Sequence, residues 1–319
     1  MKGIIAIVLA AAAIIALPFM VESYALSFMV QTLIFMALAY SWNLIGGYAG
    51  YPHFGQVAFF GLGCYVGALS VQAGIHWLVA PLLAAAFAFV CALILGMIML
   101  RLNGVFFGIG MFGIARVCES LAMGLDGITQ GGTGLYVDVV DLPTLYFVIA
   151  GIALVMIVIT WRLDSSRLGL QLLTIREDET AANALGVRTT QLKVGTFAAS
   201  ALVPGAVGSL YVSYLGFIDP FTAFAMMTEL TTIAMVLLGG LGTVFGPLVG
   251  VITLSVVNEL LWARLPEVYL ALVGFIILIT ILYMPRGIVA YAQRKNWPIV
   301  PTPRGHLRQL ASRLKGAAK

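Results

Sequence analysis

The segment Trp161–Val194 reads WRLDSSRLGLQLLTIREDETAANALGVRTTQLKV and separates two long apolar halves of the chain. It holds five of the 17 basic residues and four of the 13 acidic residues. The whole chain is 61% hydrophobic and 9% charged, with a mean hydropathy of +1.05, whereas soluble proteins are about 25% charged. No soluble fold could bury so much apolar surface, so the sequence indicates an integral membrane protein interrupted by a polar loop.

The apolar runs on either side of this loop are long and continuous. A bilayer core of about 30 Å needs about 20 apolar residues per helix, and continuous runs favour helices over the alternating pattern of a β-barrel. We therefore predict an all-α fold, a polytopic transmembrane helical bundle of about ten spans. The predicted spans are 4–20, 25–45, 56–74, 77–100, 104–123, 144–163, 192–215, 229–245, 247–265 and 268–284.

Basic residues set the predicted orientation. Eight of them, and no acidic residue, lie between Arg286 and the end of the chain. The positive-inside rule makes this tail and the central loop cytoplasmic, and both termini with them. Arg264, near the predicted outer face, is the exception. The chain divides into a transmembrane domain (1–285), with a cytoplasmic loop at 164–191, and a basic tail (286–319).

The positive-inside rule accounts for the basic residues of the tail, so we do not expect nucleic acid as a partner.

The apolar run from Gly3 to Leu17 resembles a signal peptide, but it lacks a clear cleavage site and is long enough for a first span. The three cysteines lie in apolar runs, and the histidines are scattered. This distribution predicts neither a metal site nor a catalytic centre. Gly108, Gly110 and Gly113 match a dinucleotide motif, but no strand precedes them, which favours helix packing.

Two glycine-rich interruptions, Gly46–Gly55 and Leu237–Gly250, occupy corresponding places in the two halves. Paired interruptions of this kind are typical of transporters built from two pseudo-repeated halves with the solute path between them. The alternative is close helix packing, since Gly63 and Gly67 have GxxxG spacing, as do the glycines near 246. The first interruption supplies a set of rings and hydrogen-bonding groups suited to a weak transit site. They are Tyr48, Tyr51, His53 and Gln56.

Charges inside predicted spans are expensive and are therefore candidates for function. Arg116 and Glu119 are i, i+3 neighbours, and we expect them to neutralise each other or to meet charges on a partner, with direct solute contact as the alternative. Glu229 is a further candidate for the pathway. A transporter or channel that works alone would need such acids for ion coupling, and co-purification with an ATPase would separate the two possibilities.

The polar loop is predicted to form two short helices. Leu168, Leu172 and Ile175 give the first an apolar stripe. Asp178 can cap the start of the second, and Gly186 can end it. Ala181 and Leu185 share one face of the second helix. Such a loop is suited to the groove of a soluble partner, although a solvated linker between the halves would have a similar composition.

The segment IREDETAANALGVRTTQLKV (Ile175–Val194) closely resembles the cytoplasmic loop of the LivM-type permeases. These are membrane subunits of ATP-binding-cassette importers for branched-chain amino acids. The acidic run favours the LivM type over its LivH-type partner. The resemblance covers most of the chain through further motifs in the same order. They are SWNLIGGYAGYPHFGQVAFFGLGCYVGAL (Ser41–Leu69), ITQGGTGL (Ile128–Leu135), YLGFIDP, MVLLGGLGTVFGPLVG and YMPRG (Tyr283–Gly287).

This resemblance implies an assembly in a prokaryotic plasma (inner) membrane. The chain would pair with a LivH-type permease, bind two ATPases below and receive solute from a periplasmic or extracellular binding protein. It has no Walker A sequence, so it would bind no cofactor, and ATP-Mg would be used by the partner ATPases. The implied ATPase contact comprises Arg176, Glu177, Asp178, Glu179, Ala181, Ala182, Leu185 and Gly186.

The chain departs from the family pattern at two places. Tyr51–Gln56 replaces a Gln-Leu-Ser-Leu-Gly-His segment, and the charges of Arg116 and Glu119 occur in the reverse order. Both places lie near the expected pathway, so the solute stays open. Branched-chain amino acids are the leading expectation. Urea, amides, aromatic acids and other small organic acids are the alternatives within the same importer type.

Overall fold

The computed structural model describes residues 22–102 and 104–264, together with the single positions 18, 271, 274, 275 and 278 and the short stretch 287–289. Apart from those isolated positions, the predicted first span, the predicted last span and the basic tail lie outside the described residues. The other eight predicted spans each overlap a helix, but the predicted span 229–245 runs past the end of its helix at Gly239.

The described part of the chain is helical, with one two-residue antiparallel pair of strands that aligns Leu135 with Ile218. Seven of its helical segments are long and apolar enough to cross a membrane, and α3 is a shorter apolar helix. The elements are α2 (Ser23–Trp42), the π-helix η1 (Asn43–Tyr48), α3 (Gln56–Gln72), α4 (Ala80–Met99), α5 (Val105–Gly124), α6 (Asp126–Thr129), η2 (Gly131–Thr133), β1 (Leu135–Tyr136), α7 (Leu142–Asp164), α8 (Arg167–Glu177), α9 (Glu179–Ala184), α10 (Thr189–Leu215), β2 (Phe217–Ile218), α11 (Pro220–Ala223), α12 (Met226–Gly239) and α13 (Gly246–Arg264).

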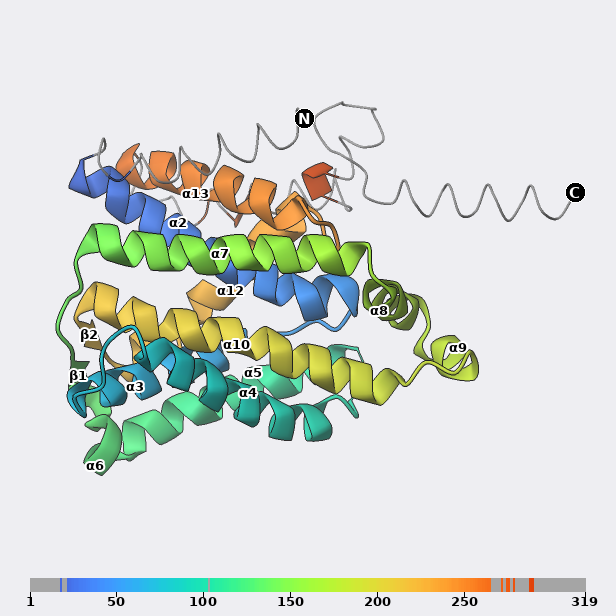
Figure 1. Cartoon of the computed structure of the whole chain (residues 1–319), viewed down its shortest axis with the longest axis horizontal. Helices are drawn as coiled ribbons and strands as arrows, with labels where there is room; N and C mark the ends of the chain where they lie inside the picture. The colour runs from blue at the N-terminus through green and yellow to red at the C-terminus, as the bar shows by residue number, and fades with distance from the viewer. Residues whose placement is uncertain are drawn as a thin grey trace, which may run out of the picture.

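The long helices lie side by side and give the bundle two ends (Figure 1). The loop helices α8 and α9 project from one end, and β1, β2 and α6 lie at the other. Helix α10 runs through the middle, with α7 on one side and α3 and α4 on the other. This arrangement separates the polar loop from the β1–β2 end by the full length of the bundle.

Small residues bring α3, α4 and α10 into close contact. A Cβ atom on Gly63 would overlap the backbone of Gly205, and one on Gly208 would overlap the carbonyl oxygen of Phe60. On α4 the buried positions Ala80, Ala84, Ala88 and Ala92 recur every four residues and form one face. Small residues are the usual means of close helix contact in membranes, because lipid provides no hydrophobic driving force between helices. The GxxxG spacing in α3 therefore serves packing.

Both predicted interruptions are present. Helix α2 widens into η1, and the chain then leaves helical structure until α3 begins at Gln56. Helix α12 ends at Gly239, and α13 begins at Gly246. The motif glycines in α5 play unequal parts: Gly108 packs against the loop before α3, whereas Gly113 has no neighbour within 4 Å of the place where a Cβ would lie.

The α3–α10 contact predicts a sharp difference between two glycines of one helix. Gly208→Ala should force α3 and α10 apart and cost about 1–3 kcal/mol, as overpacking of a filled interior does. The measurement is the apparent melting temperature of the detergent-purified chain. Gly195→Ala is the matched control, because Gly195 is exposed and no atom of the described residues lies within 4 Å of its Cβ position. Equal melting temperatures for the two variants would contradict this account of the contact.

Candidate functional site

The two glycine-rich interruptions lie in direct contact. The side chain of Asn43 accepts a hydrogen bond from the backbone N–H of Gly242 at 2.9 Å and donates one to the carbonyl oxygen of Thr243 at 3.1 Å. A Cβ on Gly47 would lie 2.7 Å from the nitrogen of Gly242. We call this contact, formed by Asn43–Gly50 with Gly240–Val244, the glycine junction. It joins segments about 200 residues apart in the sequence.

Arg176 of α8 binds directly to the glycine junction. Its Nη1 donates to the carbonyl oxygen of Gly47 at 2.7 Å. A Cβ on Gly50 would lie 2.6 Å from Cγ of Arg176, and one on Gly242 would lie 2.8 Å from Nη1. Gly50 also has a φ of +77°, which other residues rarely adopt. The missing side chains therefore make room for the arginine, which connects the polar loop to both interruptions.

A charged cluster forms a second connection to the loop. The hydroxyl of Tyr51 donates to Oε2 of Glu179 at 2.5 Å, and Nζ of Lys193 lies 2.5 Å from Oε1 of Glu179. Lys193 is buried and also donates to the Tyr51 hydroxyl at 2.8 Å. Burial opposes the charge of Glu179, but the hydrogen bonds from Lys193 and Tyr51 outweigh it and lower the pKa of Glu179. The cluster's stabilisation is therefore present above the usual glutamate pKa and is lost as pH falls through the lowered one.

The remaining candidates in the first interruption are buried. The hydroxyl of Tyr48 donates to Asp164, at the end of α7, at 3.1 Å. The ring of His53 packs edge-on against Phe197, with the ring centres 5.1 Å apart, and its carbonyl oxygen accepts from the indole of Trp42. Hydrogen bonds at Gly47, Tyr48 and Tyr51 thus join this interruption to the loop and to the end of α7.

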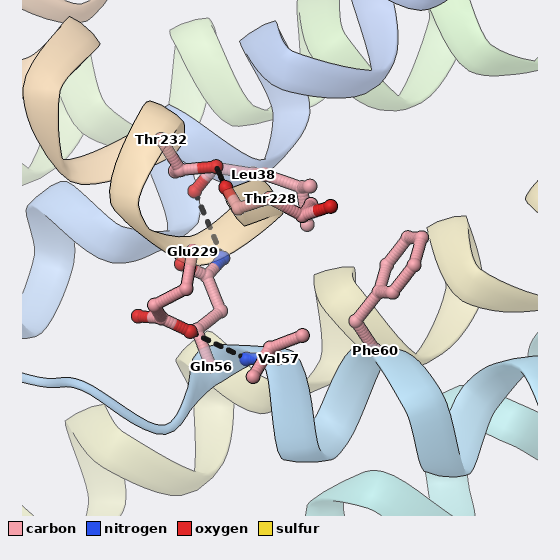
Figure 2. Close-up of a pocket in the computed structure, with 7 residues that line it drawn as sticks. All are labelled: Leu38, Gln56, Val57, Phe60, Thr228, Glu229 and Thr232. Carbon is pink, nitrogen blue, oxygen red and sulfur yellow. Dashed lines mark hydrogen bonds between the residues drawn. The ribbon is translucent and has the colours of Figure 1, made fainter. Parts of the chain in front are cut away.

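Gln56 and Glu229 meet where α3 begins, as Figure 2 shows. Oε2 of Glu229 accepts from the backbone N–H of Val57 at 2.6 Å, and the side-chain amide of Gln56 donates to the carbonyl oxygen of Leu38 at 2.9 Å. Oε1 of Glu229 and Oε1 of Gln56 are buried and have no hydrogen-bond partner among the residues that the structure describes. The cavity beside them has a volume of about 10 Å³, at the lower limit of what one water molecule needs. The two side chains join α3 to α12 and α2.

Arg116 and Glu119 form an ion pair on α5, as the spacing predicts. Nη2 of Arg116 also donates to the carbonyl oxygen of Phe224 at 2.5 Å. The pair borders an open cavity of about 450 Å³. A second open cavity, of about 330 Å³, lies next to Phe112 and Phe54. The pair is therefore partly exposed, and Phe54, which sequence reasoning did not single out, lines a cavity beside α5.

The polar loop contains the two predicted helices, α8 and α9. The side chain of Asp178 accepts from the backbone N–H of Ala181 at 3.0 Å and caps α9, and Gly186, with a φ of +83°, ends it. Leu172 and Ile175 are buried. Leu168, the third residue of the predicted apolar stripe, is 53% exposed.

The candidate contact residues of the loop face in two directions. Ala182 is fully buried against the chain's own core, so a bulky side chain there would disturb the loop itself. Leu185 is 78% exposed, and Glu177, Asp178 and Ala181 are exposed with it. Sequence reasoning missed Asn43 and Lys193, whose only signals are an amide beside glycines and a basic residue at the start of a span.

The bond from Glu229 to the start of α3 predicts unequal effects of two substitutions. Glu229→Gln keeps an acceptor for the N–H of Val57 and should melt close to the wild type. Glu229→Leu leaves that buried N–H unpaired and should cost about 1–3 kcal/mol. Thermal unfolding of both variants in detergent provides the comparison. A Glu229→Leu variant as stable as Glu229→Gln would show that this bond does not hold α3 to α12.

The chain matches known transport proteins over most of its length. The family described as branched-chain amino acid transport system / permease component matches residues 24–282. The high-affinity branched-chain amino acid transport system permease protein LivM of Salmonella typhimurium is 25% identical over 311 residues, which cover 86% of this chain and 72% of that protein. The related permease LivH of the same organism is 31% identical over 43% of this chain and 44% of its own length.

A more distant relative is the autoinducer 2 import system permease protein LsrC of Photorhabdus luminescens, which is 26% identical over 46% of this chain and 47% of its own length. No solved structure matches the chain. The family match covers far more than half of the chain, and the described helices include seven segments able to cross a membrane. The chain is a multi-pass membrane protein and belongs to the permease components of branched-chain amino acid ABC transport systems, a family of transport components and not of enzymes.

Proposed function

We propose that this chain is the LivM-type subunit of a binding-protein-dependent importer that carries branched-chain amino acids inward. It pairs with a homologous LivH-type permease and binds two ATPases, which hydrolyse ATP-Mg, while the chain itself binds no cofactor. A periplasmic or extracellular binding protein delivers the solute. The observation that carries the coupling part of this proposal is the direct bonding of the polar loop to the first interruption, through Arg176 and Glu179.

The proposed topology has ten spans in two pseudo-repeated halves, with both termini in the cytoplasm. Residues 1–285 form the permease domain, residues 164–191 the loop that couples to the ATPases, and residues 286–319 a basic tail. The contact between the two interruptions at the glycine junction supports the two halves. The position of α8 and α9 at one end of the bundle, with β1 and β2 at the other, supports a loop on a single side of the membrane (Figure 1).

The loop has outward-facing and inward-facing residues, and we assign them different parts. Outward-facing Glu177, Asp178, Ala181 and Leu185 contact the ATPase, because their side chains are exposed. Arg176 is exposed as well, but its guanidinium is bonded to Gly47, and Glu179 is bonded to Tyr51. With buried Ala182, these two residues hold the loop to the membrane domain. A movement of the docked ATPase therefore reaches the glycine junction through bonds that already exist in the chain.

Leucine is the first solute to test, with urea, an aliphatic amide and an aromatic acid as alternatives. The assembled importer, with its partner permease, ATPases and binding protein, is reconstituted in proteoliposomes. The proposal predicts uptake of labelled leucine that needs ATP. Uptake of only one of the other compounds would change the solute. Uptake without ATP and without associated ATPases would indicate a transporter that works alone.

Leu185 offers a direct test of ATPase docking. Leu185→Arg places a charge on the exposed end of α9 and should reduce ATPase co-purification about tenfold, as the loss of a central contact residue does. The chain should still insert and melt normally, because Leu185 is 78% exposed. Leu168→Arg is the matched control, since Leu168 is exposed on the same loop but outside the proposed contact. Normal ATPase recovery with Leu185→Arg would refute this docking surface.

Arg176 tests coupling separately from docking. Arg176→Ala removes the bond to Gly47 while leaving the exposed face of α9 unchanged. The ATPases should still co-purify, but leucine uptake per ATP hydrolysed should fall about tenfold, because the loop then loses its tie to the glycine junction. Arg167→Ala is the control, as Arg167 is an exposed arginine of the same helix. Unchanged uptake per ATP in Arg176→Ala would contradict the proposed coupling route.

A further inference from the structure

Two open cavities lie one after the other along α5, and together we call them the α5 groove. Ile109, Phe112, Arg116, Ser120 and Met123 recur every three or four residues and so lie on one face of the helix. The other side of the groove is lined by Phe221 of α11 and by Met226 and Leu230 of α12. The guanidinium of Arg116, which lines one cavity, lies 5.9 Å from the centre of the ring of Phe112, which lines the other.

The chemistry of the groove changes along its length. One part is lined by apolar side chains, including Val105, Ile109 and Phe112. The other part contains Arg116, Glu119 and Ser120. A lone charge that faced lipid would cost about 2.5–3.5 kcal/mol on insertion scales, and pairing removes only part of that cost. We therefore expect the charged part of the groove to face water or another protein.

The charged pair is held in place but not fully enclosed. Arg116 contacts Glu119 through Nη1 and donates to the carbonyl oxygen of Phe224 through Nη2, while its Nε has no partner in the described part of the chain. The side chain of Arg116 is 36% exposed, and that of Glu119 is 16% exposed. The carbonyl bond keeps the guanidinium at the groove, so that a carboxylate and a guanidinium stand side by side on its floor.

We propose that this groove is one wall of the solute path and that Arg116 and Glu119 recognise the zwitterion of an α-amino acid. Arg116 binds the solute carboxylate, Glu119 binds the solute ammonium group, and the apolar part of the groove receives the solute side chain. The homologous permease supplies the facing wall. This inference rests on the proposed function and names the place where that function is carried out.

The geometry suits weak binding of a solute in transit better than tight binding. A zwitterion that binds in the groove replaces the ion pair between Arg116 and Glu119 by two ion pairs with the solute. Because the charges of the protein are already paired before the solute binds, the net gain in binding free energy is small. A transport path needs sites that a solute enters readily and leaves readily. A pair of opposite charges that neutralise each other between passages meets both needs and lowers the cost of keeping charges in a span.

The groove is also connected to the polar loop. Phe54, which lines the apolar part, belongs to the first interruption, and a Cβ on Gly108 would lie 2.9 Å from its ring. Tyr51, three residues earlier, is bonded to Glu179 of α9. A movement of the loop that displaces Tyr51 therefore moves Phe54 in the groove, which gives ATP hydrolysis a direct route to the solute.

The labelling of single cysteines in the assembled importer tests whether the groove is part of the solute path. Single cysteines are placed at Ser120, in the groove, and at Val117, which is 54% exposed and does not line either cavity. The background lacks Cys64, Cys91 and Cys118. A membrane-impermeant thiol reagent should label Ser120→Cys and not Val117→Cys, and saturating leucine with ATP should slow the labelling. Absent labelling at Ser120, or labelling that leucine and ATP do not change, would overturn the proposal.

Substitution of the charges provides the second arm. Arg116→Gln/Glu119→Gln is neutral and should insert and assemble, but it should lower ATP-driven leucine uptake about tenfold or more, the loss expected when charged hydrogen-bond partners are removed. ATPase co-purification and ATP hydrolysis should stay at wild-type levels. Wild-type leucine uptake by this variant would overturn the zwitterion site while leaving the proposed function intact. A wild-type complex that lacks ATPases, or does not import leucine, would instead overturn the proposed function.

Discussion

Close backbone contact between two interrupted helices is the constraint on which the rest of this structure depends. Asn43 pairs with the backbone of Gly242 and Thr243, and Gly47 approaches Gly242 so closely that neither position has room for a side chain. Inside a membrane a broken helix is tolerated only where its free backbone groups find partners in the protein. Asn43 of the first interruption provides partners for the backbone of the second, and Arg176 binds the backbone of the first, so the two halves of the chain are held together.

The polar loop is bonded to this same contact between the two interruptions. Arg176 enters between the two interruptions, and Tyr51 binds Glu179 and Lys193. Helix α8 is therefore bonded to η1, and α9 is bonded to the irregular segment that follows η1. That segment continues to Phe54 in the α5 groove and to Gln56 at the start of α3. A short, irregular segment between rigid helices can change its backbone angles more easily than a helix can, which suits it to transmit movement.

Local features of the sequence were predictable, and features that depend on distant contacts were not. Both glycine-rich interruptions, the cap at Asp178 and the helix end at Gly186 are determined by neighbouring residues, and each was predicted correctly. The pairing of Arg116 with Glu119 was predictable because the two lie three residues apart on a helix. The burial of Ala182, the partner of Lys193 and the role of Asn43 depend on which helices pack together. Which residues of the apolar stripe in α8 are buried, Leu172 and Ile175 but not Leu168, also depends on where the loop lies against the bundle.

Hydrogen exchange of the assembled importer tests the central claim most directly, since it reports on both ends of the proposed route at once. Exchange is measured for peptides covering residues 164–191 and residues 46–55, with the ATPases free of nucleotide and then bound to a non-hydrolysable ATP analogue. Coupling through Arg176 and Tyr51 predicts that nucleotide changes the protection of both segments together. A change confined to the loop, with exchange at residues 46–55 unaltered, would contradict the account.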